Sequence, residues 1–293
     1  NHAIDVQKSY LVQAVGNTTE DSSLFYYSGA GYGYGIVTYE STHVAIVGNT
    51  CARHRHAIDA SYFSSMVSIT GNVCKGGSQA AIQVHPNCIG VTIVGNTVDG
   101  VYGHDTGDGA ELGTGEPGSG VVVRESCENV VVARNVIENC RASGISAVGD
   151  ACKDISIEGN VVRNCNITDS ASHAGIRAYN AMSRAGDNDA PGFTIRNNIV
   201  DGALQYGIKA GFNGMVVEGN TVRDVTGTGI AVGSGRDTSV SPVFDGTLTE
   251  PAIRGNVVED CTVLGIYAAG TALGATSGCD LIRPIVESNV VRR

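Results

Sequence analysis

Tryptophan is absent from this 293-residue sequence, and prolines are few, with 6 against 40 glycines. This balance suits dense turns between stacked strands better than long helices. No run of about 18 apolar residues occurs, so we expect no transmembrane helix and no membrane partner. The 9 cysteines include no Cys-x-x-Cys pair, so the spacing of a zinc site is missing.

Basic residues are also in the minority. The sequence has 19 Lys and Arg against 29 Asp and Glu, which gives a formal net charge of −10. Proteins that bind nucleic acids present a basic surface to the phosphates. The composition therefore argues against nucleic acid as the main partner, although an anionic polymer could still bind at a local basic stripe.

The sequence does contain one phrase in ten copies. Its clearest form is VTIVGNTV at 91–98, in which apolar residues alternate with others before Gly-Asn and a second short apolar pair. Such alternation predicts a strand with one buried face. Each copy contains one asparagine at the same place: Asn17, Asn49, Asn72, Asn96, Asn135, Asn160, Asn198, Asn220, Asn256 and Asn289.

The spacing of these asparagines predicts the architecture. They lie 22 to 39 residues apart, and the shortest intervals cluster at 22–25. This repeat is too short for a helix-turn-helix unit or a propeller blade, but it suits one coil of a parallel β-solenoid. An asparagine at the same turn of every coil can hydrogen-bond to the next one. We therefore expect an all-β, single-stranded parallel β-helix of about ten coils with a buried asparagine ladder.

We expect one β-helix domain over 1–293. No secretion signal is visible at the start. Because the sequence begins and ends inside a repeat, we expect it to be a fragment of a longer chain.

The cysteines follow the same repeat. Cys88, Cys127 and Cys152 each precede a repeat asparagine by eight residues, in successive coils. Equivalent positions in adjacent coils lie about 4.8 Å apart, so we expect interior stacks of small apolar side chains. That spacing would also permit a disulfide, but the regular stacking favours free thiols.

A second phrase, Gly or Ala followed by Ile or Val, alternates with the first, as in Ala57-Ile58 and Gly175-Ile176. Three alanines among the ten small residues indicate a steric limit rather than a need for positive φ. We call this segment the GI strand. Its small residues should leave one edge of its outer face clear of bulky side chains. Each coil should then have a GI strand, the asparagine-containing strand and room for a third short strand.

Insertions in the repeat fall on both sides of the GI strands. Loops on a rigid scaffold often carry function, so we expect the loops to wall a floor made of GI strands. The insertions before GI strands are 18–33, 99–118 and 163–173, and those after them are 180–192, 233–250 and 269–282.

The outward positions of the GI strands hold the candidate binding residues. If the isoleucine points inward, the next residue and the one two further on point outward. An ordinary solvated face would also be polar, but cationic and aromatic residues concentrate on the walled face of an acidic protein. We expect the following residues to bind substrate: Tyr39, Arg55, Gln83, Arg124, Arg177, Tyr179 and Lys209.

These repeats resemble right-handed parallel β-helix proteins of the pectate-lyase-like superfamily over the whole chain. The segments GYGYGI at 31–36 and RHRHAID at 53–59 are similar to β-helix domains of bacteriophage tailspikes and polysaccharide depolymerases. The resemblance implies right-handed coils, a homotrimer and an extracellular or virion location. It does not fix the reaction, because this fold hosts lyases, hydrolases, epimerases, esterases and adhesins. The Asp-Pro-His motif of alginate epimerases and the paired-aspartate and Gly-His-Gly motifs of polygalacturonases are missing.

The segment 53–59 is the first candidate for catalysis. In a β-elimination on a uronate, a base removes the C5 proton while cations neutralise the carboxylate. His56 or His85 could be the base, with Arg55, Arg124 or Arg177 on the carboxylate. The alternative is a structural corner held by an Arg–Asp pair and a stacked histidine.

The second candidate is the glycine-rich acidic segment 102–116, which contains His104 and Asp105. Glycosidases need two carboxyl groups roughly 5 to 9.5 Å apart, and Asp105 with Asp59 or Glu111 could supply them. The same oxygens could hold Ca²⁺, and we expect no other cofactor. The plainer alternative is a solvated loop.

Together these observations predict a lyase or glycoside hydrolase that acts on a bacterial or algal glycan, acidic glycans included. The alternative is a non-catalytic receptor-binding or structural spike. The candidate catalytic residues are His56, Asp59, His85, His104 and Asp105.

Overall fold

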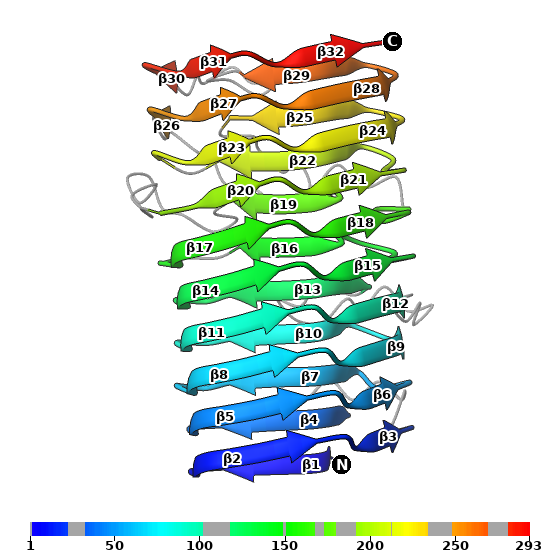
Figure 1. Ribbon diagram of the computed structural model, residues 1–293, viewed down its shortest axis with the longest axis vertical. Helices are drawn as coiled ribbons and strands as arrows, with labels where there is room; N and C mark the ends of the chain where they lie inside the picture. The colour runs from blue at the N-terminus through cyan, green and yellow to red at the C-terminus, as the bar shows by residue number, and fades with distance from the viewer. Residues whose placement is uncertain are drawn as a thin grey trace, which may run out of the picture.

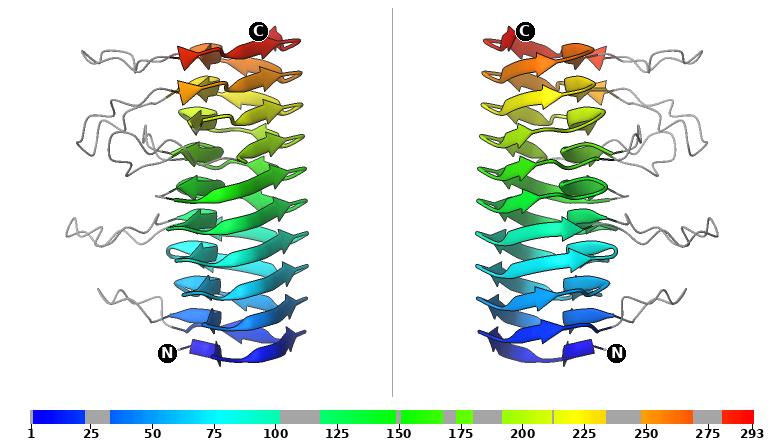
Figure 2. Two further views of the ribbon diagram at one scale, coloured as in Figure 1. Left: turned by 90° about the vertical axis from the view of Figure 1, so that its left-hand side faces the viewer. Right: turned by 90° about the vertical axis from the view of Figure 1, so that its right-hand side faces the viewer.

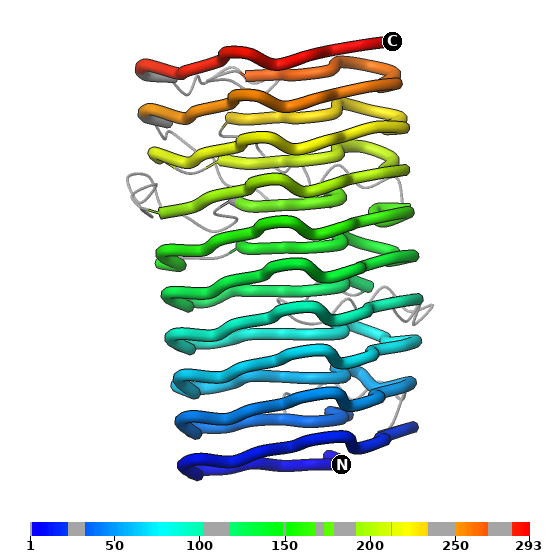
Figure 3. The backbone as a smooth tube through the Cα atoms, viewed as in Figure 1, coloured from blue at the N-terminus to red at the C-terminus, as the bar shows by residue number. Residues whose placement is uncertain are grey.

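The computed structural model is a stack of ten coils, each of which contributes one strand to each of three parallel sheets (Figure 1). The termini lie at opposite ends of the stack (Figure 3). The all-β prediction of about ten coils is confirmed. The residues that the structure describes are 2–22, 33–101, 118–148, 151–167, 173–179, 192–211, 213–233, 248–268 and 281–293. Within these ranges there is no helix long and apolar enough to cross a membrane.

The three sheets form three faces of the stack, as two side views show (Figure 2). Sheet A contains the GI strands: β1 (His2–Gln7), β4 (Tyr34–Tyr39), β7 (His56–Ser61), β10 (Ala80–His85), β13 (Ser119–Arg124), β16 (Ile145–Val148), β19 (Ile176–Tyr179), β22 (Tyr206–Gly211), β25 (Thr228–Val232) and β29 (Leu264–Ala268). Sheet B contains the strands before the repeat asparagines: β2 (Tyr10–Val15), β5 (Thr42–Val47), β8 (Ser65–Thr70), β11 (Ile89–Val94), β14 (Glu128–Ala133), β17 (Lys153–Glu158), β20 (Thr194–Arg196), β23 (Val216–Glu218), β27 (Ala252–Arg254) and β31 (Ile285–Glu287).

Sheet C contains the third, short strand of each coil: β3 (Thr18–Glu20), β6 (Thr50–Ala52), β9 (Val73–Gly77), β12 (Thr97–Val101), β15 (Val136–Glu138), β18 (Val161–Arg163), β21 (Ile199–Asp201), β24 (Thr221–Val225), β28 (Val257–Cys261) and β32 (Val290–Arg292). A separate two-stranded sheet pairs β26 (Leu248–Thr249) with β30 (Leu281–Ile282).

The core follows from the alternation in the repeat. In β11, Val91 and Ile93 are fully buried, whereas Thr92 and Val94 between and after them keep exposed surface. Val98 of β12 closes the same coil from sheet C and is also fully buried. Equivalent side chains stack from coil to coil, so the protein has a long, continuous apolar core.

The repeat asparagines form the predicted ladder at the turn between sheets B and C. Asn96 is fully buried, and its Oδ1 accepts hydrogen bonds from the backbone N–H and the side-chain amide of Asn72, both at 2.9 Å. Its own Nδ2 donates to Asn135 Oδ1 and to the carbonyl of Ile69, again at 2.9 Å. The same links connect all ten asparagines from Asn17 to Asn289. Each coil is therefore tied to the next by side chains as well as backbone.

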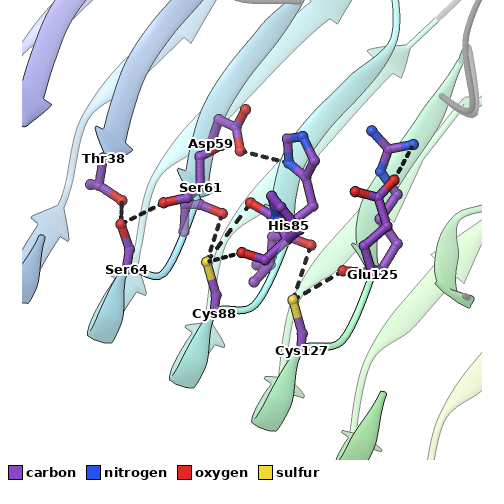
Figure 4. Close-up of polar contacts among 12 residues, drawn as sticks. Thr38, Asp59, Ser61, Ser64, His85, Cys88, Glu125 and Cys127 are labelled. Carbon is purple, nitrogen blue, oxygen red and sulfur yellow. Dashed lines mark hydrogen bonds and ion pairs between the residues drawn. The ribbon is translucent and has the colours of Figure 1, made fainter. Parts of the chain in front are cut away.

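The cysteine stack lies inside the corner between sheets A and B. Cys88, Cys127 and Cys152 are fully buried and free of disulfides, which confirms their predicted state. The Cys127 thiol donates to the carbonyl of Arg124 at 3.0 Å, and the Cys88 thiol donates to the carbonyl of Ala60 at 3.3 Å (Figure 4). These thiols satisfy backbone carbonyls close to the ends of the sheet A strands.

The small residues of the GI strands have an interior cause. A Cβ placed on Gly120 would lie 2.5 Å from both Ile137 Cγ2 and the carbonyl oxygen of Gly144, so it would point into the core. The steric limit is confirmed, but the small residues do not leave an edge of the outer face clear, as we expected. The alternation breaks at this step, and Tyr34 and His56 stack on each other at 5.2 Å just before it.

The long connections lie at the two corners that border sheet A. The first group joins sheet C to sheet A, between β3 and β4, β12 and β13, and β18 and β19. The second group leaves sheet A, after β19, β25 and β29. This is the distribution that the repeat spacing predicted, and it directs attention to the outer face of sheet A.

Candidate functional site on sheet A

The outer face of sheet A carries two rows of side chains, with one residue per coil in each. Strand pairing sets the alignment, and it agrees with the alternation counted from the GI isoleucines. The first row, from β7 to β22, consists of Asp59, Gln83, Val122, Ser146, Arg177 and Lys209. The second row, from β7 to β19, consists of Ser61, His85, Arg124, Val148 and Tyr179.

Asp59 and His85 face each other from the adjacent strands β7 and β10 (Figure 4). The distance from Asp59 Oδ1 to His85 Nδ1 is 3.4 Å. Asp59 is fully buried, and neither of its carboxylate oxygens accepts a hydrogen bond. Burying a carboxylate without such partners is costly, so the imidazole is well placed to offset its charge.

Gln83 connects this pair to a cation. With the carboxamide oriented to suit its neighbours, the oxygen accepts from His85 Nδ1 at 2.8 Å and from Arg124 Nη2 at 3.0 Å. The amide nitrogen donates to His56 Nδ1 at 2.9 Å. His85 Nδ1 therefore carries a hydrogen, and Nε2 holds the lone pair when the ring is neutral. Nε2 is the atom that can accept a proton from a substrate.

We call Asp59, Gln83, His85 and Arg124 the dyad cluster. The side chains of His85 and Arg124 are 11% and 12% exposed, so the cluster reaches the surface through its base and its cation. Arg124 also lies 3.4 Å from the carboxylate of Glu125 at the corner that follows β13. A substrate that approaches the cluster meets a proton acceptor and a guanidinium side by side.

His56 is better suited to orienting Gln83 than to acting as a base. It is 3% exposed, and its ring stacks on Tyr34. Burial, followed by the charge of Arg55, holds the pKa of His56 well below its usual value. The ring is thus neutral near pH 7 and its Nδ1 is occupied by Gln83, which favours His85 as the base.

The first half of the 53–59 segment holds the corner between sheets C and A. Arg53 donates to both carboxylate oxygens of Asp21, at 2.7 and 2.8 Å, and this bond lowers the pKa of Asp21. His54 is buried, and its Nε2 lies 3.0 Å from Thr19 Oγ1. The structural alternative for this segment therefore applies to its first two residues, whereas His56 and Asp59 face the dyad cluster.

The first row continues beyond Val122 with three polar residues. Ser146, Arg177 and Lys209 occupy consecutive coils and are 0%, 5% and 8% exposed. Lys209 Nζ lies 5.0 Å from the centre of the Tyr206 ring, within range of a cation–π interaction. Two cations are therefore held side by side on the sheet, where they add local positive charge to an acidic protein.

Aromatic rings border the second row at the corner after β4 and β7. The rings of Tyr39 and Tyr62 lie 4.8 Å apart, and Tyr62 is 6.0 Å from the His85 ring. Phe63 follows and is strongly exposed. Sugar rings often pack on exposed aromatic faces. Our sequence reasoning missed Tyr62, although an aromatic pair directly after a GI strand was a visible signal.

The remaining candidates are either turned elsewhere or not described. Arg55 Nη2 donates to Gln79 Oε1 at 3.3 Å. Tyr179 is described only as backbone in β19. His104 and Asp105, with the Ca²⁺ site considered for their loop, lie outside the described residues. Within the part of the chain that is described, no group of three or more His, Cys, Asp or Glu residues could hold a metal ion.

Comparisons with known proteins agree on the fold. No curated protein sequence matches the chain. Among solved structures, the periplasmic alginate epimerase AlgG matches with a TM-score of 0.60 and 14% identity, over 94% of this chain and 62% of its own. An alginate lyase from Paenibacillus sp. str. FPU-7 matches with a TM-score of 0.58 and 16% identity, over 83% of this chain and 77% of its own. PfbA, a surface adhesin of Streptococcus pneumoniae, matches with a TM-score of 0.50 and 14% identity, over 96% and 71%.

This chain thus spans less than two thirds of the epimerase, and at these identities the likeness shows the fold alone. A family model described as "Right handed beta helix region" matches residues 1–115 and 114–291. The predicted right-handed parallel β-helix is thereby confirmed. Since the two matches cover nearly the whole sequence, the protein belongs to the right-handed β-helix family.

Proposed function

We propose that the outer face of sheet A binds an acidic polysaccharide and cleaves it by β-elimination beside a uronate unit. The observation that carries this proposal is the buried Asp59 carboxylate 3.4 Å from His85 Nδ1, with Arg124 joined to the same imidazole through Gln83. This arrangement combines a base, a group that offsets the charge of the protonated base, and a cation for the substrate. β-Elimination on a uronate requires all three.

The reaction assigns one role to each group. His85 Nε2 takes the C5 proton of the uronate, and the electron pair moves toward its carboxylate, where Arg124 stabilises the developing charge. The bond between C4 and the glycosidic oxygen then breaks, a C4=C5 double bond forms, and the departing sugar oxygen takes up a proton. Asp59 balances the imidazolium that exists after the first transfer, and Gln83 holds the ring and the guanidinium in place.

Hydrolysis has less support from the described residues. A glycosidase needs two carboxyl groups at the scissile bond. Between β7 and β22, Asp59 is the sole carboxylate that the structure describes in the two rows. Its immediate neighbours are His85, Gln83 and a cation, which suits proton abstraction from a carbon acid better than paired-carboxylate chemistry.

The structural neighbours fit a glycan-binding role. Two of them are named for action on alginate, a polymer of uronates, and the third is named as a surface adhesin. Their names place them in the periplasm or on the cell surface, so we also propose an extracellular or virion location. A homotrimeric, tailspike-like assembly belongs to the same proposal, and analytical ultracentrifugation of the purified chain would test it.

The decisive experiment compares the wild-type protein with His85→Ala on a panel of uronate polymers. The readout is the ultraviolet absorbance of the new C4=C5 double bond, with reducing ends measured in parallel. Arg223→Ala is a matched control, because Arg223 pairs with Asp201 on the surface of sheet C.

We expect wild type and Arg223→Ala to produce the double bond and His85→Ala to lose roughly 10²- to 10⁴-fold in turnover. Reducing ends without new absorbance would identify a hydrolase. Binding with neither signal would identify the adhesin-like alternative.

A further inference from the structure

Beyond the dyad cluster, the first row of sheet A contains a second polar group that the proposed reaction does not use. Ser146, Arg177 and Lys209 occupy consecutive coils and are directly paired through β16, β19 and β22. All three are more than nine-tenths buried. Since adjacent strands lie about 4.8 Å apart, two cations and a hydroxyl line one narrow strip of the surface.

The Ser146 hydroxyl is the sharpest feature of this strip. It is fully buried, and its oxygen has no hydrogen-bond partner. Buried hydroxyls are almost always hydrogen-bonded, so one that lies on an outer row beside a guanidinium needs an explanation. Arg177 and Lys209 have further contacts of their own. The inference therefore depends on the unsatisfied hydroxyl and on the placement of the cations.

The charges beside Ser146 indicate which kind of group would satisfy it. Arg177 and Lys209 carry like charges on paired positions and are both poorly hydrated, which is unfavourable unless an anion lies between or above them. An anionic oxygen could accept from the Ser146 hydroxyl and from both cations. Such charge-assisted hydrogen bonds are the strong ones.

Val122 separates this strip from the dyad cluster. Val122 is 1% exposed and stands between Gln83 and Ser146 in the first row. Arg177 is four coils from Asp59, a distance of about 19 Å at the usual strand spacing. One uronate cannot reach both places, so the strip would contact a different unit of the same polymer.

We propose that Ser146, Arg177 and Lys209 form a distal anion subsite, which binds a carboxylate or sulfate group of the polysaccharide several units from the bond that is cleaved. The subsite rests on the proposed glycan-binding face but not on the chemistry at His85. It makes affinity depend on the charge and the length of the polymer. Oligomers too short to extend from the dyad cluster past Val122 gain nothing from it.

The test measures equilibrium binding to the His85→Ala protein, so that substrate is not consumed. The probes are long and short oligouronates, a sulfated neutral glucan, its unsulfated form and inorganic sulfate as a competitor. Arg177→Ala and Lys209→Ala are compared with Lys209→Arg, which keeps the charge. Lys153→Ala is the matched control, because Lys153 is exposed on sheet B.

For long oligouronates, we expect Arg177→Ala and Lys209→Ala to raise Kd by roughly 10- to 100-fold, while Lys209→Arg and Lys153→Ala change it little. Short oligouronates should bind all variants alike. Ser146→Asp supplies a built-in anion, so it should weaken binding while raising Tm. Tighter binding of the sulfated glucan than of oligouronates would identify sulfate as the ligand group.

Unchanged Kd values for every probe in folded Arg177→Ala and Lys209→Ala would overturn the subsite, even if His85 proves catalytic. Conversely, a loss of binding in these variants in a protein that never forms a double bond would retain the subsite and reject the lyase.

Discussion

Asp59 and His85 are 26 residues apart in the chain, yet strand pairing brings Asp59 Oδ1 to 3.4 Å from His85 Nδ1. The pair arises because Gln83, two residues before His85, stands directly beside Asp59 in the first row. In a β-helix, chemistry is thus assembled by choosing one residue on each of several neighbouring coils. This relationship leads to the first prediction.

Asp59→Asn should lower kcat and leave KM nearly unchanged. The amide keeps the size of the carboxylate but cannot offset an imidazolium at His85, and this charge exists only once the proton has moved. We expect kcat to fall roughly 10- to 100-fold on any polymer that the wild type cleaves. Steady-state kinetics measure both constants. An equal rise in KM with intact kcat would instead give Asp59 a role in binding.

Asn96→Ala should destabilise the fold strongly. The substitution leaves the Asn72 amide groups and the Ile69 carbonyl without partners in a buried ladder. Because each unsatisfied group costs about 1–3 kcal/mol, we expect the free energy of unfolding to fall by about 3–5 kcal/mol. Urea denaturation followed by circular dichroism measures it.

Asn17→Ala is the control for this ladder experiment, because Asn17 is only partly buried and donates to one neighbour, Asn49. We expect it to lower the free energy of unfolding by about 1 kcal/mol. Similar losses in the two variants would contradict the importance of the buried ladder.

Alkaline pH should weaken the fold through the buried thiols. Burial raises the pKa of Cys152 from 9.0 to about 12. A group whose pKa is raised on folding contributes stability that is complete below its unfolded pKa and is lost as pH rises through its folded pKa. The free energy of unfolding should therefore decline between pH 9 and 12, and Cys152→Ala should decline less steeply, by up to about 1.4 kcal/mol per pH unit. Parallel slopes for the two proteins would contradict this prediction.

Gly120→Ala should be more harmful than a glycine replacement at a turn. Its Cβ would meet Ile137 Cγ2 and the carbonyl of Gly144 at 2.5 Å, which the packed core cannot relieve cheaply. We expect a loss of about 2–3 kcal/mol. At Gly95, with a φ of +66°, an added Cβ has no atom within 4 Å, so Gly95→Ala should cost only backbone strain of about 1 kcal/mol. Thermal unfolding of both variants would check the order.

The sequence was informative wherever a residue repeats in register. The asparagines predicted the ladder because a single polar residue at a fixed place in every coil has few other uses. The isoleucines of the GI strands predicted the alignment of Asp59 with Gln83, because alternation fixes which side chains share a face. The cysteine stack followed for the same reason.

Other features depend on geometry that the repeat does not encode. The purpose of Gly120 was misjudged because its Cβ direction depends on a break in alternation next to the neighbouring coil. His56 and His85 could not be ranked from the sequence, since the difference is a hydrogen bond from Gln83 to the first and a surface opening at the second. The roles of all site residues stay predictions until the variants are measured.

The linear arrangement of the coils has a consequence for local stability. Each coil contacts only the coil before it and the coil after it, so an end coil is held on one side and a central coil on two. Opening should therefore begin at the ends and move inward, and backbone amides should exchange with solvent more slowly toward the middle. The dyad cluster and the distal anion subsite occupy coils three to eight, and they would keep their geometry while the terminal coils open and close.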